Sequence, residues 1–156
     1  MERMRFKTTA ALLVLLLAAP AHAQPILPAS TGTGSEQPDG SDPFIRCAGL
    51  YTAFLKHARS MAPEVVPAIQ ASIKTLMIEG AESRAEVRGG SRDQYRAAVE
   101  TETRAVGDAY AQRLEKNYES NGDPFKGDAQ IQTDMTFCKR LTDRLEKQPD
   151  PTGPRN

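Results

Sequence analysis

The chain has 156 residues, and its 20 basic and 20 acidic side chains leave no net charge at neutral pH. A balanced surface offers no electrostatic attraction to nucleic acid or to anionic lipid, so we expect neither as a partner. The length suits one modest domain once any targeting segment is set aside.

The first 23 residues have the three parts of a secretory signal peptide. Three basic residues in the first seven form the start, residues 10–19 form an apolar run, and Ala-His-Ala at 21–23 fits the pattern that precedes cleavage. A permanent anchor is the alternative, but spanning a bilayer takes about 20 apolar residues. We therefore predict Sec export with cleavage after Ala23, to a bacterial periplasm or outside the cell, and no membrane span in the mature chain.

Cleavage would leave 133 residues with a net charge of −2. Residues 24–41 are rich in Pro, Gly, Ser and Thr and cannot bury enough apolar surface to offset the entropy of ordering them, so we predict a disordered tether. Residues 148–156 contain three prolines and are predicted to form a disordered tail. The folded domain is expected over residues 42–147.

Apolar residues at the three-and-four spacing of a helix face predict the first two helices. The first spans residues 42–61, with Asp42 as its N-cap and Pro43 in its first turn. The second runs from about Val66 to Arg88, because the glycine pair that follows is a helix stop.

The same spacing predicts a third and a fourth helix. The third opens with a capping box between Ser91 and Gln94 and ends at Asn121-Gly122. The fourth runs from about Asp128 to Lys147. Since no segment alternates with period two and the connections are short, we predict an all-α, up-down-up-down four-helix bundle.

The mature chain would hold two cysteines, Cys47 on the first predicted helix and Cys138 on the fourth. An oxidising compartment favours a disulfide between them, with two free buried thiols as the alternative. No Cys-x-x-Cys motif points to redox or metal chemistry. A bridge requires Cα atoms within about 7 Å, so the first and last helices should be neighbours. In the register that we expect, residues 139–147 extend past the start of the first helix as a less well packed end.

His57 would be the only histidine of the mature chain, so it is the only candidate for a catalytic histidine. Its position at the edge of the apolar stripe is typical of a half-exposed boundary residue. The cofactor hypothesis is a haem held by His57 and by Met61, Met77 or Met135, although methionines at helical spacing are more typical of a core. His57 is thus the one cofactor-binding candidate, and we expect no resident cofactor.

Glu102 interrupts the apolar stripe of the third predicted helix. We expect it to pair with an arginine such as Arg84 or Arg88, and a small polar pocket is the alternative. Asp123 and Asp128 flank a loop that superficially suggests calcium, but the loop lacks the alternating oxygen ligands and final glutamate of an EF-hand. We predict no catalytic residue and no metal ligand.

These patterns favour a non-enzymatic exported module that binds another envelope or secreted protein, in a chaperone-, inhibitor- or immunity-like role. The alternative is a helical bundle that binds haem or another small ligand. An enzyme is a third possibility, and His57 and Glu102 are the residues through which it would be tested.

Overall fold

The computed structural model describes residues 39–61 and 63–147, with side chains for all of these except residues 57–61. Over these ranges the chain forms four α-helices and no strand, with a 3-10 turn η1 (Pro63–Val65) before the second helix. The helices are α1 (Asp42–Met61), α2 (Val66–Arg88), α3 (Arg92–Asn121) and α4 (Ala129–Leu145). The all-α class and the helix spans are as predicted. The predicted signal peptide, the tether up to residue 38 and the tail lie outside the described residues.

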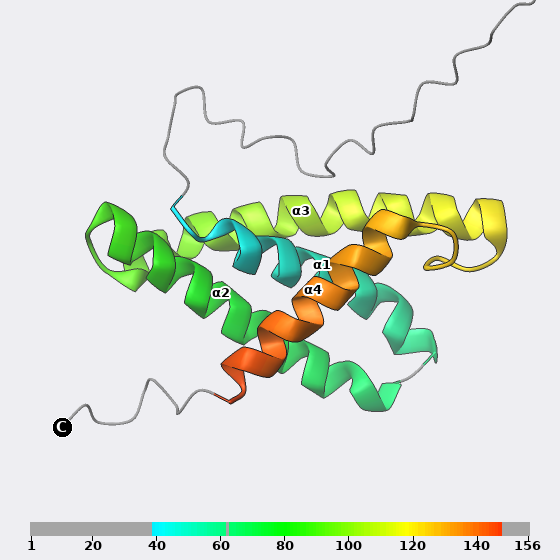
Figure 1. Cartoon of the computed structure of the whole chain (residues 1–156), viewed down its shortest axis with the longest axis horizontal. Helices are drawn as coiled ribbons and strands as arrows, with labels where there is room; N and C mark the ends of the chain where they lie inside the picture. The colour runs from blue at the N-terminus through cyan, green and yellow to red at the C-terminus, as the bar shows by residue number, and fades with distance from the viewer. Residues whose placement is uncertain (1–38, 62, 148–156) are drawn as a thin grey trace, which may run out of the picture.

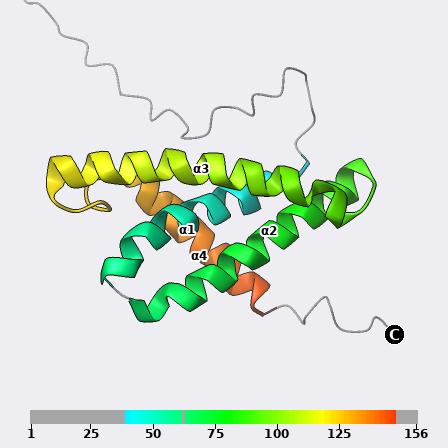
Figure 2. The same cartoon turned by 180° about the vertical axis from the view of Figure 1, so that it is seen from behind.

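Successive helices run in opposite directions, as predicted (Figure 1). α2 and α3 meet at the Gly89-Gly90 turn and diverge from it, and α1 packs against both. α4 crosses α1 diagonally in Figure 1, and the reverse view in Figure 2 places α4 behind α1. α1 is therefore the central helix, in contact with each of the other three.

Two glycines allow α1 and α3 to approach closely. A Cβ added to Gly49 would lie 2.5 Å from Val106 Cγ1, and a Cβ added to Gly107 would lie 3.3 Å from the carbonyl oxygen of Gly49. The first distance is too short for a real Cβ contact and the second is tighter than most, so a larger residue at either position would force neighbouring atoms to shift. The close approach brings α1 deep into the protein, where Ala48, Leu50 and Ala53 are fully buried.

The core draws side chains from all four helices. Its main cluster comprises Cys47, Ala48, Leu50, Ala53, Leu76, Tyr110, Leu114, Ile131, Cys138 and Leu141. A smaller cluster of Ile45, Ala81 and Val99 lies towards the α2–α3 turn. The predicted apolar stripes therefore face one another, as helix amphipathicity requires.

Two predicted helix starts differ in detail from the structure. The carbonyl of Ser41, one residue before the predicted cap Asp42, accepts the first hydrogen bonds of α1, from the N–H groups of Phe44 and Ile45. The predicted capping box at Ser91 does not form, because the N–H of Gln94 donates to the Ser91 carbonyl oxygen and the Ser91 side chain makes no cap bond.

The predicted register of α4 is wrong at its C-terminal end. Residues 139–147 were expected to extend past the start of α1, but α4 crosses α1 towards α2. Leu141 and Thr142 are each 8% exposed, and the Thr142 hydroxyl lies 3.3 Å from the hydroxyl of Tyr51. Leu141 and Thr142 are therefore packed, because a diagonal crossing carries α4 over α1 instead of past it, whereas Arg144, Glu146 and Lys147 are exposed.

Candidate functional site

A disulfide joins α1 to α4 in the middle of the core. Cys47 and Cys138 are bonded, with their Cα atoms 5.2 Å apart, and neither residue is exposed to solvent. The pairing confirms the predicted bridge between the first and last helices. Because these are the chain's two cysteines, no thiol is available for nucleophilic or metal chemistry while the bond is intact.

A buried polar cluster lies next to the disulfide and is formed by Arg46, Tyr110 and Asp134. The Tyr110 hydroxyl donates to Asp134 Oδ2 at 2.6 Å, Arg46 Nε donates to the Tyr110 hydroxyl at 3.2 Å, and Arg46 forms an ion pair with Asp134 Oδ1. Burial, followed by the hydrogen bond to Asp134, raises the pKa of Tyr110 above its ordinary value. The cluster holds α1, α3 and α4 together with its charges paired.

Asp134 is missing from the sequence-based candidates. It lies three residues after Ile131 and four before Cys138, so it interrupts the apolar stripe of α4 just as Glu102 interrupts that of α3. This spacing is a signal that sequence reasoning could have used. The spacing gives no partner, however, because Arg46 and Tyr110 come from other helices.

Asp128 is the N-cap of α4, and both of its carboxylate oxygens accept hydrogen bonds. Its carboxylate accepts from the backbone N–H groups of Gln130 and Ile131, from Arg113 Nε and Nη2 at 2.5 and 2.8 Å, and from Asn117 Nδ2 at 2.9 Å. The bond from Arg113 is the main cause that holds the pKa of Asp128 well below its usual range, against the opposing effect of burial. A carboxylate with about four lone-pair positions has none left for a metal ion here.

The loop between α3 and α4 shows no calcium site either. Asp123 Oδ1 accepts hydrogen bonds from the backbone N–H groups of Phe125 and Lys126, so it stabilises the turn. Among the residues that the structure describes, no group of three His, Cys, Asp or Glu side chains could hold a metal ion. Asp123 and Asp128 are thus structural residues.

Glu102 pairs with Arg84, as the sequence predicted. Arg84 Nη1 and Nη2 donate to the two carboxylate oxygens, both at 2.8 Å. Arg84 Nε lies 2.8 Å from Asp39 Oδ2, and Arg84 Nη2 donates to the Ser41 hydroxyl at 2.8 Å. Arg88 Nη2 lies 3.0 Å from the same Asp39 oxygen. This cluster binds the residues before α1 to α2 and α3.

The cluster moves the boundary of the folded domain. Residues 39–41 were expected to belong to the tether, but Asp39 is 4% exposed and Ser41 is fully buried. Burial alone would raise the pKa of Asp39. The hydrogen bonds from Ser41 and the charges of Arg84 and Arg88 together outweigh burial and hold that pKa below its ordinary value. Residues 39–41 therefore belong to the folded part of the chain.

The three clusters hold the helices together. Their carboxylates accept hydrogen bonds from, or form ion pairs with, arginines and N–H groups of other elements. His57 lies in α1 by its backbone, but its side chain falls outside the described residues. Its predicted boundary position and the haem hypothesis therefore remain predictions.

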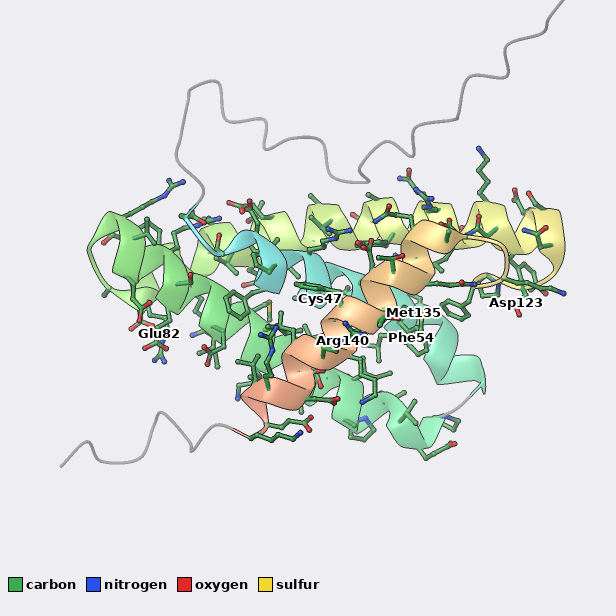
Figure 3. The ribbon with its side chains drawn as sticks, viewed as in Figure 1. Cys47, Phe54, Glu82, Asp123, Met135 and Arg140 are labelled. Atoms are coloured by element: carbon green, nitrogen blue, oxygen red, sulfur yellow. A yellow bond between two sulfur atoms is a disulfide. The ribbon has the colours of Figure 1, made fainter. Side chains whose placement is uncertain are left out.

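An apolar groove of about 460 Å³ opens between α1, α2 and α4. Phe54 and Met135 lie beside each other where α4 crosses α1 (Figure 3). Phe125, from the α3–α4 loop, packs on Phe54 with ring centroids 5.1 Å apart and supports this wall. The groove is lined by Leu50, Tyr51, Phe54, Ala68, Ile69, Ser72, Met135, Thr136 and Lys139. We call it the α1/α2/α4 groove.

The groove follows from the arrangement of the helices. Because α2 diverges from α3 and α4 crosses α1 diagonally, α2 and α4 both pack on α1 with a hollow between them. A smaller hollow of about 210 Å³ continues along α2 and α4, sharing Ala68 and Ser72 with the groove. The apolar surface therefore extends along much of this face.

A second hollow of about 440 Å³ lies at the α2–α3 hairpin. It is lined by the apolar residues Met77, Ile78 and Ala81 and by the charged residues Lys74, Arg92, Asp93, Arg96 and Glu100. Lining charges of both signs favour no ligand of one charge. The α1/α2/α4 groove is therefore the better-defined candidate for binding.

No protein-family model matches this chain, and neither does any curated protein or solved structure. None of the helices in the described part of the chain is long and apolar enough to cross a membrane.

Proposed function

We propose that the protein is an exported, non-enzymatic helical module that binds another envelope or secreted protein through the α1/α2/α4 groove. The observation that carries the proposal is the apolar lining of the groove, since partner side chains contribute most of their binding energy in such desolvated hollows. The occupant is a segment that presents aliphatic or aromatic side chains. Lys139 is the charged residue of the lining, and its Nζ forms an exposed ion pair with Asp143 Oδ2 at 2.7 Å.

Export to an oxidising compartment is supported by the Cys47–Cys138 disulfide, because disulfides persist there and are rare in a reducing cytosol. Cleavage after Ala23 belongs to the same proposal. Intact-mass measurement of the protein from the cell envelope or medium should give a chain that starts at Gln24. A mature mass that includes residues 12–17 would contradict it.

The paired charged clusters support a binding role over a catalytic one. Asp128, Asp134 and Glu102 each form an ion pair with an arginine. Chemistry at any of them would require breaking contacts that hold the helices together. The groove, in contrast, can be filled without disturbing the three clusters.

The binding test compares two arginine substitutions. Ala68→Arg places a long charged side chain in the groove, and Ala97→Arg makes the same change on the exposed side of α3. The wild type and Ala97→Arg should recover one partner from an envelope extract, and Ala68→Arg should not. A synthetic peptide from that partner with an apolar segment should then bind the purified wild type directly. Equal recovery by all three proteins would refute a role for the groove.

A small apolar ligand or haem is the second candidate, and the groove also favours it. Its volume of about 460 Å³ lies within the usual range of ligand pockets, and the Met135 thioether, a possible iron ligand, lines it. Haem added to the purified protein should then give a shifted Soret band that Met135→Leu alters. Absence of any Soret change would remove haem from consideration.

A further inference from the structure

We infer that Asn121 is a site of spontaneous covalent modification, through deamidation with the neighbouring Gly122. The chain has three asparagines, Asn117, Asn121 and Asn156, and glycine follows Asn121 alone. A glycine has no Cβ, so its backbone nitrogen can approach the preceding side chain with little steric hindrance. Asn121 is the last residue of α3, and both Asn121 and Gly122 are exposed.

In this reaction the backbone nitrogen of Gly122 attacks Cγ of Asn121. A new N–Cγ bond closes a five-membered succinimide, the Cγ–Nδ2 bond breaks, and ammonia leaves with the proton from the Gly122 nitrogen. Water then opens the ring at either carbonyl. The products are aspartate and isoaspartate, the latter with the main chain passing through the former side chain.

The folded structure restrains the attacking nitrogen. The N–H of Gly122 donates to the carbonyl oxygen of Tyr118 at 2.7 Å, and the φ of +69° at Gly122 is the left-handed cap that ends α3. Asn121 Nδ2 donates to the carbonyl oxygen of Lys126 at 3.4 Å, which restrains the side chain as well. The reaction must therefore pass through an opened last turn, and its rate reports how often that turn opens.

Asn117 provides a control within the same chain. Its Nδ2 donates to Asp128 and to the carbonyl oxygen of Pro124, at 2.9 and 3.2 Å, and tyrosine follows it. A bulky following residue and a half-buried, doubly bonded amide both oppose cyclisation. Modification should therefore occur at Asn121 and not at Asn117.

The product changes the end of α3 and the loop after it. A new carboxylate lies at the negative end of the dipole of a 30-residue helix and two residues from Asp123, so it is disfavoured there. Isoaspartate also lengthens the main chain by one methylene. Both changes disturb the turn that Asp123 holds and that brings Phe125 against Phe54.

The test follows modification of the mature protein at mildly alkaline pH, in buffer and in concentrated urea. Peptide mass spectrometry should find the conversion of amide to acid at residue 121, and isoaspartyl methyltransferase should label the product. The rate in buffer should be about tenfold lower than in urea, because the cap must open first. No reaction at Asn121 in urea, or faster reaction at Asn117, would overturn the proposal.

Two variants test control by the cap. Asp123→Ala removes the hydrogen bonds to Phe125 N and Lys126 N, so it should raise the rate in buffer and leave the rate in urea unchanged. Asp143→Ala, at an exposed ion pair on α4, should change neither rate. Equal rates in buffer and urea for the wild type, or no response to Asp123→Ala, would refute protection by the cap.

Discussion

The Tyr110 hydroxyl donates a hydrogen bond of 2.6 Å to Asp134, and this contact joins α3 to a helix that packs mainly on α1. Tyr110 is fully buried and Asp134 is 2% exposed. A buried carboxylate is tolerated only with a compensating charge, which Arg46 supplies from α1. The position of α4 therefore depends on polar contacts as well as on the disulfide.

Replacing the buried carboxylate should destabilise the protein. Asp134→Asn keeps the shape and an acceptor for Tyr110, but it leaves Arg46 without its anion. We expect a loss of about 2 kcal/mol, below the value for a fully buried pair because the Arg46 side chain is 30% exposed. Urea unfolding measures this difference in the free energy of unfolding.

Asp143→Asn is the matched control, since Asp143 also lies on α4 but pairs with the exposed Lys139. It should change stability by less than about 0.5 kcal/mol. Arg46→Met combined with Asp134→Asn should recover part of the loss, because neither charge then remains unpaired. Equal losses for Asp134→Asn and Asp143→Asn would show that the buried cluster contributes no more to the free energy of unfolding than an exposed ion pair does.

Removal of the disulfide should cost more than any single polar contact. The bond closes a loop with a sequence separation of 91 residues, which corresponds to about 4.6 kcal/mol in the chain-entropy model. The double variant Cys47→Ala/Cys138→Ala should lose this amount in urea unfolding relative to the oxidised protein. Because both cysteines are fully buried, the native protein should also resist reductant until it unfolds. A loss below about 1 kcal/mol would contradict the chain-entropy account.

The helix spans could be predicted because their signals lie within each helix, and the disulfide because two cysteines can form only one pair. Three-and-four spacing locates α2 and its glycine stop, and two cysteines allow one pairing. The pairing of Glu102 with Arg84 was also predicted, because a charge within an apolar stripe needs a partner. These inferences need no knowledge of how the helices cross.

The crossing of the helices could not be read from the sequence. The contact between Gly49 and Gly107 and the diagonal path of α4 depend on how side chains of two helices interlock, which periodicity does not encode. The partners of Asp134 and the α1/α2/α4 groove follow from that crossing. The groove that we propose as the binding surface is thus the part of the candidate site that sequence spacing does not predict.

Asp128 should make the protein less stable in acid. Its folded-state pKa is depressed, chiefly by Arg113, so its contribution is complete above the unfolded value of about 3.9 and is lost as the pH falls towards the folded value. Asp128→Asn keeps a side-chain oxygen at the cap but does not titrate. Unfolding midpoints measured from pH about 7 down to about 3 should therefore fall less steeply for this variant than for the wild type.

Asp123→Asn is the control for that pH series, because Asp123 is exposed and has no ion pair in the described structure. Its profile should follow the wild type. If Asp128→Asn and the wild type lose stability in parallel as the pH falls, the carboxylate of Asp128 is not the group that titrates.

The last prediction separates the tether from the residues that precede α1. A chain that begins at Gln37 should unfold at the same urea concentration as one that begins at Gln24, since the composition of residues 24–36 offers little to bury. Beginning at Gln37 keeps two residues between the new terminal ammonium and Asp39, the residue that contacts Arg84. Asp39→Ala in either chain should lose about 2 kcal/mol, because Arg84, at 7% exposure, then lacks one of its carboxylates.

Asp42→Ala is the control, since Asp42 lies three residues further on and is exposed. It should lose no more than about 0.5 kcal/mol of helix-dipole stabilisation. A shortened chain that is destabilised as much as Asp39→Ala would mean that the tether itself packs on the domain, whereas a harmless Asp39→Ala would mean that its contacts with Arg84 and Arg88 do not stabilise the fold.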